Sequence, residues 1–334
     1  MNRACKKYVI ATLALGATGS TAVAGDDIFL NFGNSGADPV ESFGLQGDPG
    51  NDVRDVVIPN GRIIGNTSWD GILQSVALGT QGADASVRVE PNGLPAGVGV
   101  NIQLGSGGTF AGERGFMGMS DALLGVTVPE GSWGFEFFER FDNSPDNEDA
   151  LWNDLDVTLD TADVAFSTRF DGSTDPNNQS FLEGPRFQSI FDRPVGTGPN
   201  VNQAGMIELD AIPFFVNESG FYNFTSLQNY AGYMHLYRDE FDPLQSVSDT
   251  LIEGDDNGES GLTANTTSQF TDVFLDADRT YFLVTSGDDP GDVGEYSVFI
   301  SGPGEAFLIP APGAMALFGM TFATNARRRR RTLS

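Results

Sequence analysis

Residues 132–141 read SWGFEFFERF, and this stretch decides the fold class of the chain. In an extended backbone, Trp133, Phe135 and Phe137 fall on one side, while small and charged residues fall mainly on the other. Alternation with a period of two is typical of a β-strand that buries one face. Phe138 interrupts the polar side. We therefore expect a β-strand here, with these three aromatic side chains on one of its faces.

Similar strands recur along the chain, separated by turn-forming residues. The sequence has 334 residues, among them 42 glycines, 17 prolines and 26 phenylalanines. Residues 280–286 (TYFLVTS) and 295–301 (EYSVFIS) flank the turn-rich GDDPGDVG, which predicts a hairpin. Residues 220–227 (GFYNFTSL) and 233–239 (YMHLYRD) are two further candidate strands. The pattern predicts an all-β chain built from β-sandwich or jelly-roll modules.

The strand pattern weakens in one internal region, which predicts a boundary between two modules. Loop-forming residues dominate FDGSTDPNNQS and RPVGTGPNVNQAG, where no clear periodicity remains. We therefore expect a first β-sandwich module at 26–165, a linker at 166–180, a second module at 181–304 and a short linker at 305–312.

Both ends of the chain carry features of export segments. Residues 1–24 combine a basic start, an apolar stretch and small residues that end at Ala22 and Ala24, the order of a cleavable signal peptide. The apolar run that begins residues 313–334 would reach only ~20 Å as a helix, against a hydrocarbon core of ~30 Å. Five arginines follow it and favour a cytoplasmic C-terminus: Arg327, Arg328, Arg329, Arg330 and Arg331. We expect export and a short C-terminal membrane helix.

Composition excludes several kinds of chemistry for the expected mature chain. Between Asp26 and Ala326 stand 46 acidic residues and ten arginines, a formal charge of −36, which repels nucleic acid and anionic lipid. Adaptation to salt explains such an excess as well as a role for divalent cations does. The only lysines and the only cysteine lie in residues 1–24, so disulfides and lysine nucleophiles are excluded. The single histidine, His235, lies on a predicted strand, where we expect it to pack rather than to catalyse.

Two acidic loops are candidate calcium sites. Calcium takes six to eight oxygen ligands, and both loops are rich in carboxylates and amides, although neither has the spacing of an EF-hand. The alternative for each is a solvated acidic turn. The candidate ligands are Asp142, Asp146, Glu148 and Asp149 with Asn143 and Asn147, and Asp255, Asp256 and Asn257 with Glu259.

Part of the second module resembles a known family. The order of its segments from PFFVNESGFYNFTS (213–226) to GEYSVFISGPG (294–304) is similar to pre-peptidase C-terminal β-sandwiches, and more closely to a secreted bacterial family with a Phe-Asp-Pro motif. The motif here is Phe241, Asp242 and Pro243. The resemblance implies a noncatalytic accessory module of secreted enzymes or surface proteins. Independently of it, Pro243 should stiffen the corner, and Asp242 can bond backbone amides. Residues 128–159 loosely resemble the closing strands of a P-domain jelly roll.

The C-terminal segment resembles the PEP-CTERM sorting signal. The match consists of Pro310, Ala311, Pro312 and Gly313, followed by the short apolar run and the arginines, with Ala311 at the position of the family's glutamate. The resemblance implies cleavage by a membrane protease, an exosortase, and delivery to the cell surface or the extracellular polysaccharide matrix. The alternative is an ordinary short anchor with a stop-transfer charge.

These observations leave three hypotheses about function. The first is an exported bacterial surface or matrix protein, noncatalytic and either structural or carbohydrate-binding, with Trp69, Trp133 or Trp152 stacking on sugar beside carboxylates. The second is a calcium-dependent adhesin module. The third is a glycosidase that uses two carboxylates at a suitable separation. The expected partners are signal peptidase, the sorting protease and extracellular polysaccharide, and calcium is the one candidate cofactor.

Overall fold

The computed structural model describes most of the chain between residues 27 and 309. The described ranges are 27–33, 39–42, 45–58, 62–76, 81–127, 131–140, 150–162, 165–178, 207–246, 250–253 and 267–309, and for the backbone alone 8–9, 187–194, 201–206 and 254. Within these ranges the helical elements are two single-turn 3-10 helices, η1 (Gly82–Asp84) and η2 (Pro243–Gln245). The other regular elements are strands, so the predicted all-β class is confirmed.

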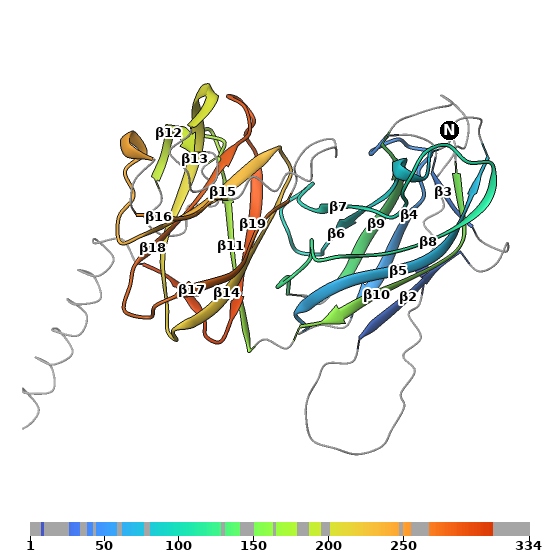
Figure 1. Ribbon diagram of the computed structural model, residues 1–334, viewed down its shortest axis with the longest axis horizontal. Coiled ribbons are helices and arrows are strands. Elements are labelled where there is room, and N and C mark those ends of the chain that lie inside the picture. The colour runs from blue at the N-terminus through green and yellow to red at the C-terminus, as the bar shows by residue number, and fades with distance from the viewer. Residues whose placement is uncertain are drawn as a thin grey trace, which may run out of the picture.

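Two sheets form the first sandwich, on the right of Figure 1. Sheet A has the order β1-β4-β9-β6-β7, and sheet B has the order β2-β10-β5-β8, with β3 paired to β10. The strands are β1 (Tyr8–Val9), β2 (Ile28–Phe32), β3 (Val40–Ser42), β4 (Val53–Ile58), β5 (Ile64–Ser75), β6 (Ala85–Glu90), β7 (Val100–Gln103), β8 (Gly112–Ser120), β9 (Gly131–Glu139) and β10 (Ala150–Thr161).

The core of the first sandwich follows from the alternation along β9. Trp133, Phe135 and Phe137 lie on one face of this strand and are fully buried. The Phe135 and Phe137 rings each lie 5.2 Å, centroid to centroid, from the Phe32 ring of the facing sheet. Phe138 is buried as well, on the opposite face of β9, which explains the break in the polar pattern.

Two further sheets form the second sandwich, on the left of Figure 1. Sheet C has the order β11-β19-β14-β17, and sheet D has the order β12-β13-β18-β15-β16, with β20 paired to β13. The strands are β11 (Phe166–Ser173), β12 (Phe187–Pro194), β13 (Val201–Val216), β14 (Gly220–Gln228), β15 (Gly232–Arg238), β16 (Leu251–Gly254), β17 (Thr267–Leu275), β18 (Tyr281–Gly287), β19 (Glu295–Gly302) and β20 (Ala306–Leu308).

The predicted hairpin at 280–301 is wrong, although both of its strands exist. Strand β18 lies between β13 and β15 in sheet D, whereas β19 lies between β11 and β14 in sheet C. The connection at 288–294 therefore crosses from one sheet to the other. Both strands are buried along most of their length and each pairs on both edges. Turn-forming residues mark where the chain reverses, but they do not decide which sheet receives the next strand.

Parts of both predicted linkers are strands of the second sandwich. Residues 166–173 form β11, which pairs with β19 along its whole length. Residues 306–308 form β20, which pairs with β13. The sequence of β11 resembles that of a loop because its outward residues are polar. Two of them, Ser167 and Arg169, donate hydrogen bonds to backbone carbonyls of the first sandwich.

The two sandwiches lie side by side and meet at the outer face of sheet C (Figure 1). Leu227 and Phe299 belong to the second sandwich, yet both are fully buried in the hydrophobic cluster of the first. Side chains of the second sandwich around this contact donate to backbone carbonyls of the first, and four of these hydrogen bonds are 2.7 Å or shorter. These four hydrogen bonds run from Thr225 Oγ1 to Leu124 (2.5 Å), Gln269 Nε2 to Asp121 (2.6 Å), Ser167 Oγ to Gly125 (2.6 Å) and Arg169 Nη2 to Gly93 (2.7 Å).

The Phe-Asp-Pro turn covers the outer face of sheet D. Phe241 packs against Tyr237 with ring centroids 4.7 Å apart. Asp242 caps η2, since its Oδ1 accepts a hydrogen bond from the backbone N–H of Leu244 at 2.9 Å, and Pro243 is the first residue of η2. The predicted role of Asp242 as an acceptor for backbone amides is confirmed.

Buried tyrosines of the second sandwich predict a loss of stability at alkaline pH. Desolvation by burial raises the pKa of Tyr230 and of Tyr237. Above about pH 10 the unfolded chain releases these phenolic protons while the folded chain keeps them, so the stabilisation is complete below pH 10 and falls as pH rises. Above pH 10, each tyrosine should lower the free energy of unfolding by about 1.4 kcal/mol per pH unit. Urea unfolding between pH 8 and 11 measures this loss.

The double variant Y230F/Y237F is the control for this prediction. It has no phenol to ionise at these two positions, so its stability should fall less steeply above pH 10. An identical pH dependence in the parent and in the double variant would contradict the assignment.

Candidate functional site

The outer face of sheet B, which points away from the core, is the candidate binding surface. Strand register sets its side chains in rows that cross β2, β10, β5 and β8. The first row is Phe29, Thr158, Ser68 and Met119; the second is Asn31, Asp156, Asp70 and Met117; the third is Asp154, Ile72 and Gly115. We call these three rows the sheet B face.

Strand β10 shows why the sequence places these residues outward. It reads ALWNDLDVTLDT, in which Leu155, Val157 and Leu159 are buried in the core. The residues between them alternate to the other side, and Asp154 and Asp156 there are exposed. One strand therefore supplies both the core and a row of carboxylates.

Like charges stand close together on the sheet B face. Asp156 lies directly opposite Asp70 in the cross-strand register, and the Asn31 amide donates to Asp156 Oδ1 at 2.7 Å. At the edge of the same face, desolvation and the nearby Asp27 raise the pKa of Asp160. Like charges directly opposite each other destabilise a sheet, so this arrangement costs stability. None of the three rows contains a lysine or an arginine.

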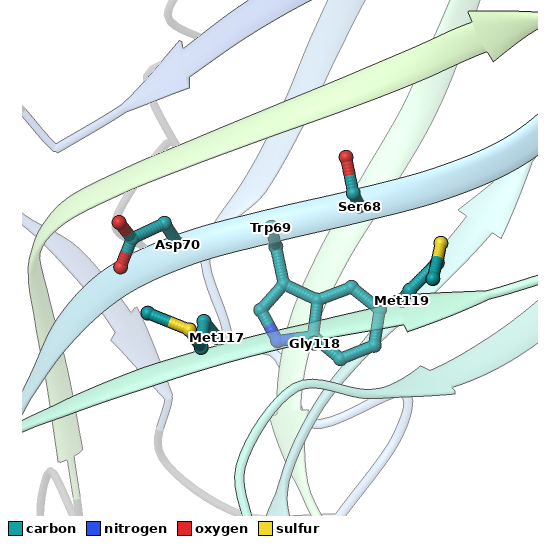
Figure 2. Close-up of a pocket in the computed structure, with 6 residues that line it drawn as sticks. All are labelled: Ser68, Trp69, Asp70, Met117, Gly118 and Met119. Atoms are coloured by element: carbon teal, nitrogen blue, oxygen red, sulfur yellow. The ribbon is translucent and has the colours of Figure 1, made fainter.

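An open pocket lies at the β5–β8 edge of this face. It is lined by Ser68, Trp69, Asp70, Met117, Gly118 and Met119 (Figure 2). Trp69 pairs with Gly118, and a Cβ at Gly118 would overlap the indole ring. The indole Nε1 donates to the Leu104 carbonyl at 2.7 Å. Trp69 therefore points toward the core, and its packing on Gly118 fixes the register of β8 against β5.

The sheet B face combines hydrogen-bonding groups with apolar side chains. Carboxylates, one amide and two hydroxyls can accept or donate hydrogen bonds. Phe29, Met117 and Met119 are 70%, 79% and 67% exposed, so they offer apolar contact area to a ligand. Among the described residues, no group of three histidine, cysteine, aspartate or glutamate side chains is arranged to hold a metal ion.

The predicted tryptophan platform for sugar is wrong. Trp133 and Trp152 are fully buried in the first core, and the partly buried Trp69 points inward as well. An indole has a large apolar area, so burying it in the core stabilises the fold more than leaving it exposed. Sequence alternation does not show which side of a strand faces solvent. His235 is fully buried, in agreement with its predicted packing role.

The other predicted site residues lie outside the described part of the chain. They are the signal-cleavage residues Ala22 and Ala24, the calcium candidates at 142–149 and 255–259, the sorting motif Pro310 to Gly313, and Arg327 to Arg331. The predicted helix at 313–334 also lies there. Across the described ranges, no helix has both the length and the apolarity that crossing a membrane requires.

Sequence reasoning missed the residues that form the sheet B face. The signal was present, because β10 alternates apolar residues with aspartates, and Met117-Gly118-Met119 alternates in the same way. Only the strand register shows that Asp156, Asp70 and Met117 are neighbours, since they come from three strands far apart in the sequence.

No protein-family model matches this chain, and no curated protein matches it. Solved structures with similarity include N-glycanase F (PNGase F), which is 10% identical, with 85% of this chain and 99% of that chain covered and a TM-score of 0.36. The tandem CBM22-1–CBM22-2 domain of Xyn10C from Paenibacillus barcinonensis is 10% identical, with 88% and 100% covered and a TM-score of 0.25. PNGF-II is 12% identical, with 83% and 66% covered and a TM-score of 0.32. These similarities are too distant to transfer a function.

Proposed function

We propose that this chain is an exported, noncatalytic protein of the bacterial surface or extracellular matrix, and that it binds polysaccharide through the sheet B face. The observation that carries the proposal is the sheet B face itself. Its opposed carboxylates Asp70 and Asp156 cost stability, and its apolar side chains Phe29, Met117 and Met119 are exposed, so the fold alone does not account for either.

The spacing of the face suits a polyhydroxylated polymer. Neighbouring strands lie about 4.8 Å apart, and residues on one face of a strand repeat about every 6.6 Å. Carboxylates accept hydrogen bonds from hydroxyl groups, while Phe29 and the methionines can contact the C–H faces of sugar rings. Since the face is negative, it favours neutral or amine-bearing polysaccharides and repels anionic ones.

Two features support a binding role over catalysis. Asp70 and Asp156 stand side by side on one sheet face, whereas glycosidases place two carboxylates on either side of the scissile bond. Catalysis by a Ser-His-Asp arrangement is disfavoured as well, because His235, the one histidine of the sequence, is fully buried. The features of residues 1–24 and 310–334 support export and surface sorting.

Asp156→Asn tests the proposed surface. A hydrogen bond to a carboxylate contributes about 1.5–3 kcal/mol, so affinity for a bound neutral polysaccharide should fall about tenfold or more. Folding should be maintained, because the substitution removes a like-charge contact with Asp70. Affinity electrophoresis through gels that contain neutral, amino or anionic polysaccharides measures the effect.

Asp278→Asn is the matched control, since it removes the same charge from an exposed position of the second sandwich. It should leave polysaccharide binding unchanged. The proposed surface would be contradicted if every polysaccharide that retards the parent retarded Asp156→Asn equally. It would also be contradicted if no polysaccharide retarded the parent.

A further inference from the structure

The two methionines of β8 are unusual for side chains on a strand. Among the described residues, Met117 and Met119 belong with Phe29 to the three most exposed large apolar side chains of the first sandwich, at 79% and 67%. They lie two positions apart, so both project from the same face of β8. Their Cα atoms are separated by about 6.6 Å, and the three rotatable bonds of each side chain allow the two sulfur atoms to converge.

The strand beneath the methionines is held in place. Gly118 faces the core and lies against Trp69, and the indole is anchored by its hydrogen bond to Leu104. A shift of β8 by one residue would replace Gly118 with a methionine under the indole, so packing excludes that register. Met117 and Met119 are therefore fixed outward at the pocket in Figure 2.

Oxygen donors stand next to the two thioethers. Asp70 is the cross-strand partner of Met117, and Ser68 is the partner of Met119. All four side chains line the same pocket. The pocket thus presents two sulfur donors, one carboxylate and one hydroxyl from two adjacent strands.

This donor set selects a soft cation. Thioethers bind Cu(I) and are poor ligands for hard cations, whereas calcium needs six to eight oxygens and this pocket offers far fewer. A carboxylate balances the charge of a monovalent ion, and the surrounding aspartates attract cations to the face. We propose that Met117, Met119 and Asp70 form a binding site for a soft monovalent metal ion, and that the ion bound there is Cu(I). The site does not depend on polysaccharide binding.

Titration with Cu(I) and with Ag(I), a redox-inert probe of the same class, tests the site. Every full-length chain used in these titrations, including the parent, carries Cys5→Ser, so that the thiol does not compete for the metal ion. Competition with a chromogenic Cu(I) chelator should show one saturable site in this parent. Met117→Leu and Met119→Leu should each weaken binding at least about tenfold, because each removes a ligand while keeping a similar side-chain volume.

Met234→Leu is the matched control, since Met234 is fully buried in the second sandwich and the substitution is the same. It should leave affinity unchanged. In a chain labelled at the methionine methyl groups, Ag(I) should shift the NMR signals of Met117 and Met119 but not that of Met234. No saturable Cu(I) uptake by the parent, or equal affinity in M117L/M119L, would overturn the site. Because Asp156 is not a proposed ligand, Asp156→Asn should retain a Cu(I) site even if the polysaccharide proposal fails.

Discussion

Replacing Trp133 with alanine is expected to lower the free energy of unfolding of the first sandwich by about 3–5 kcal/mol. Trp133 is fully buried on β9, at the centre of sheet A between β4 and β6. Removing the indole takes a large apolar area out of the core and leaves a cavity that the two sheets cannot fill without moving apart. Urea unfolding followed by circular dichroism measures the loss.

Val57→Ala is the control for the tryptophan substitution. Val57 lies on β4, one position beyond Val56, the residue that pairs with Trp133, but it points outward and is 63% exposed. Its truncation should change stability by no more than about 0.5 kcal/mol. Trp133→Phe should recover most of the loss, because it refills most of the cavity. A loss below about 1 kcal/mol for Trp133→Ala would contradict a central role of this side chain.

The strands were predictable from sequence where one face is apolar and the other polar. Strand β9 follows from alternation, because burial of one face imposes a period of two on the residues. Strands β14 and β15 were also predicted, although both of their faces are buried along much of their length. Strand β11 was not predictable, since its outward residues meet backbone carbonyls of the other sandwich and can therefore be polar. A polar residue at such a contact looks the same in sequence as one in water.

Strand partners were not predictable for a different reason. The loop between β18 and β19 has the composition of a tight turn, but the two strands separate into sheets D and C because each pairs with strands distant in the sequence. The candidate site has the same origin. Asp70, Met117 and Asp156 become neighbours only through the register of β5, β8 and β10. Local pattern identifies a strand, whereas its neighbours are set by packing of the whole chain.

A second large effect is expected at the contact between the sandwiches. Leu227→Asp should lower the stability of this contact by at least about 3 kcal/mol, because it places a carboxylate where an apolar side chain is fully buried. Leu227 lies on β14 of the second sandwich but packs in the hydrophobic cluster of the first, together with Phe299. An aspartate there can regain its hydration only if the two sandwiches separate.

The rest of each core is independent of Leu227, so separation should not unfold the sandwiches. The second sandwich keeps its own cluster around Phe214, whose ring lies 6.1 Å from the Phe224 ring and 5.7 Å from the Tyr281 ring. We therefore expect Leu227→Asp to increase the radius of gyration in small-angle X-ray scattering while strand content by circular dichroism is kept. Urea unfolding should then resolve into two transitions.

Leu244→Asp is the matched control, because it introduces the same charge into the same sandwich at a leucine that is 83% exposed on η2. It should leave the radius of gyration and the unfolding midpoint unchanged, since the carboxylate stays in water. If Leu227→Asp behaved like Leu244→Asp, the contact would not depend on burial of Leu227. If it instead abolished the strand signal, the two sandwiches would be one cooperative unit, because neither core would survive without the contact.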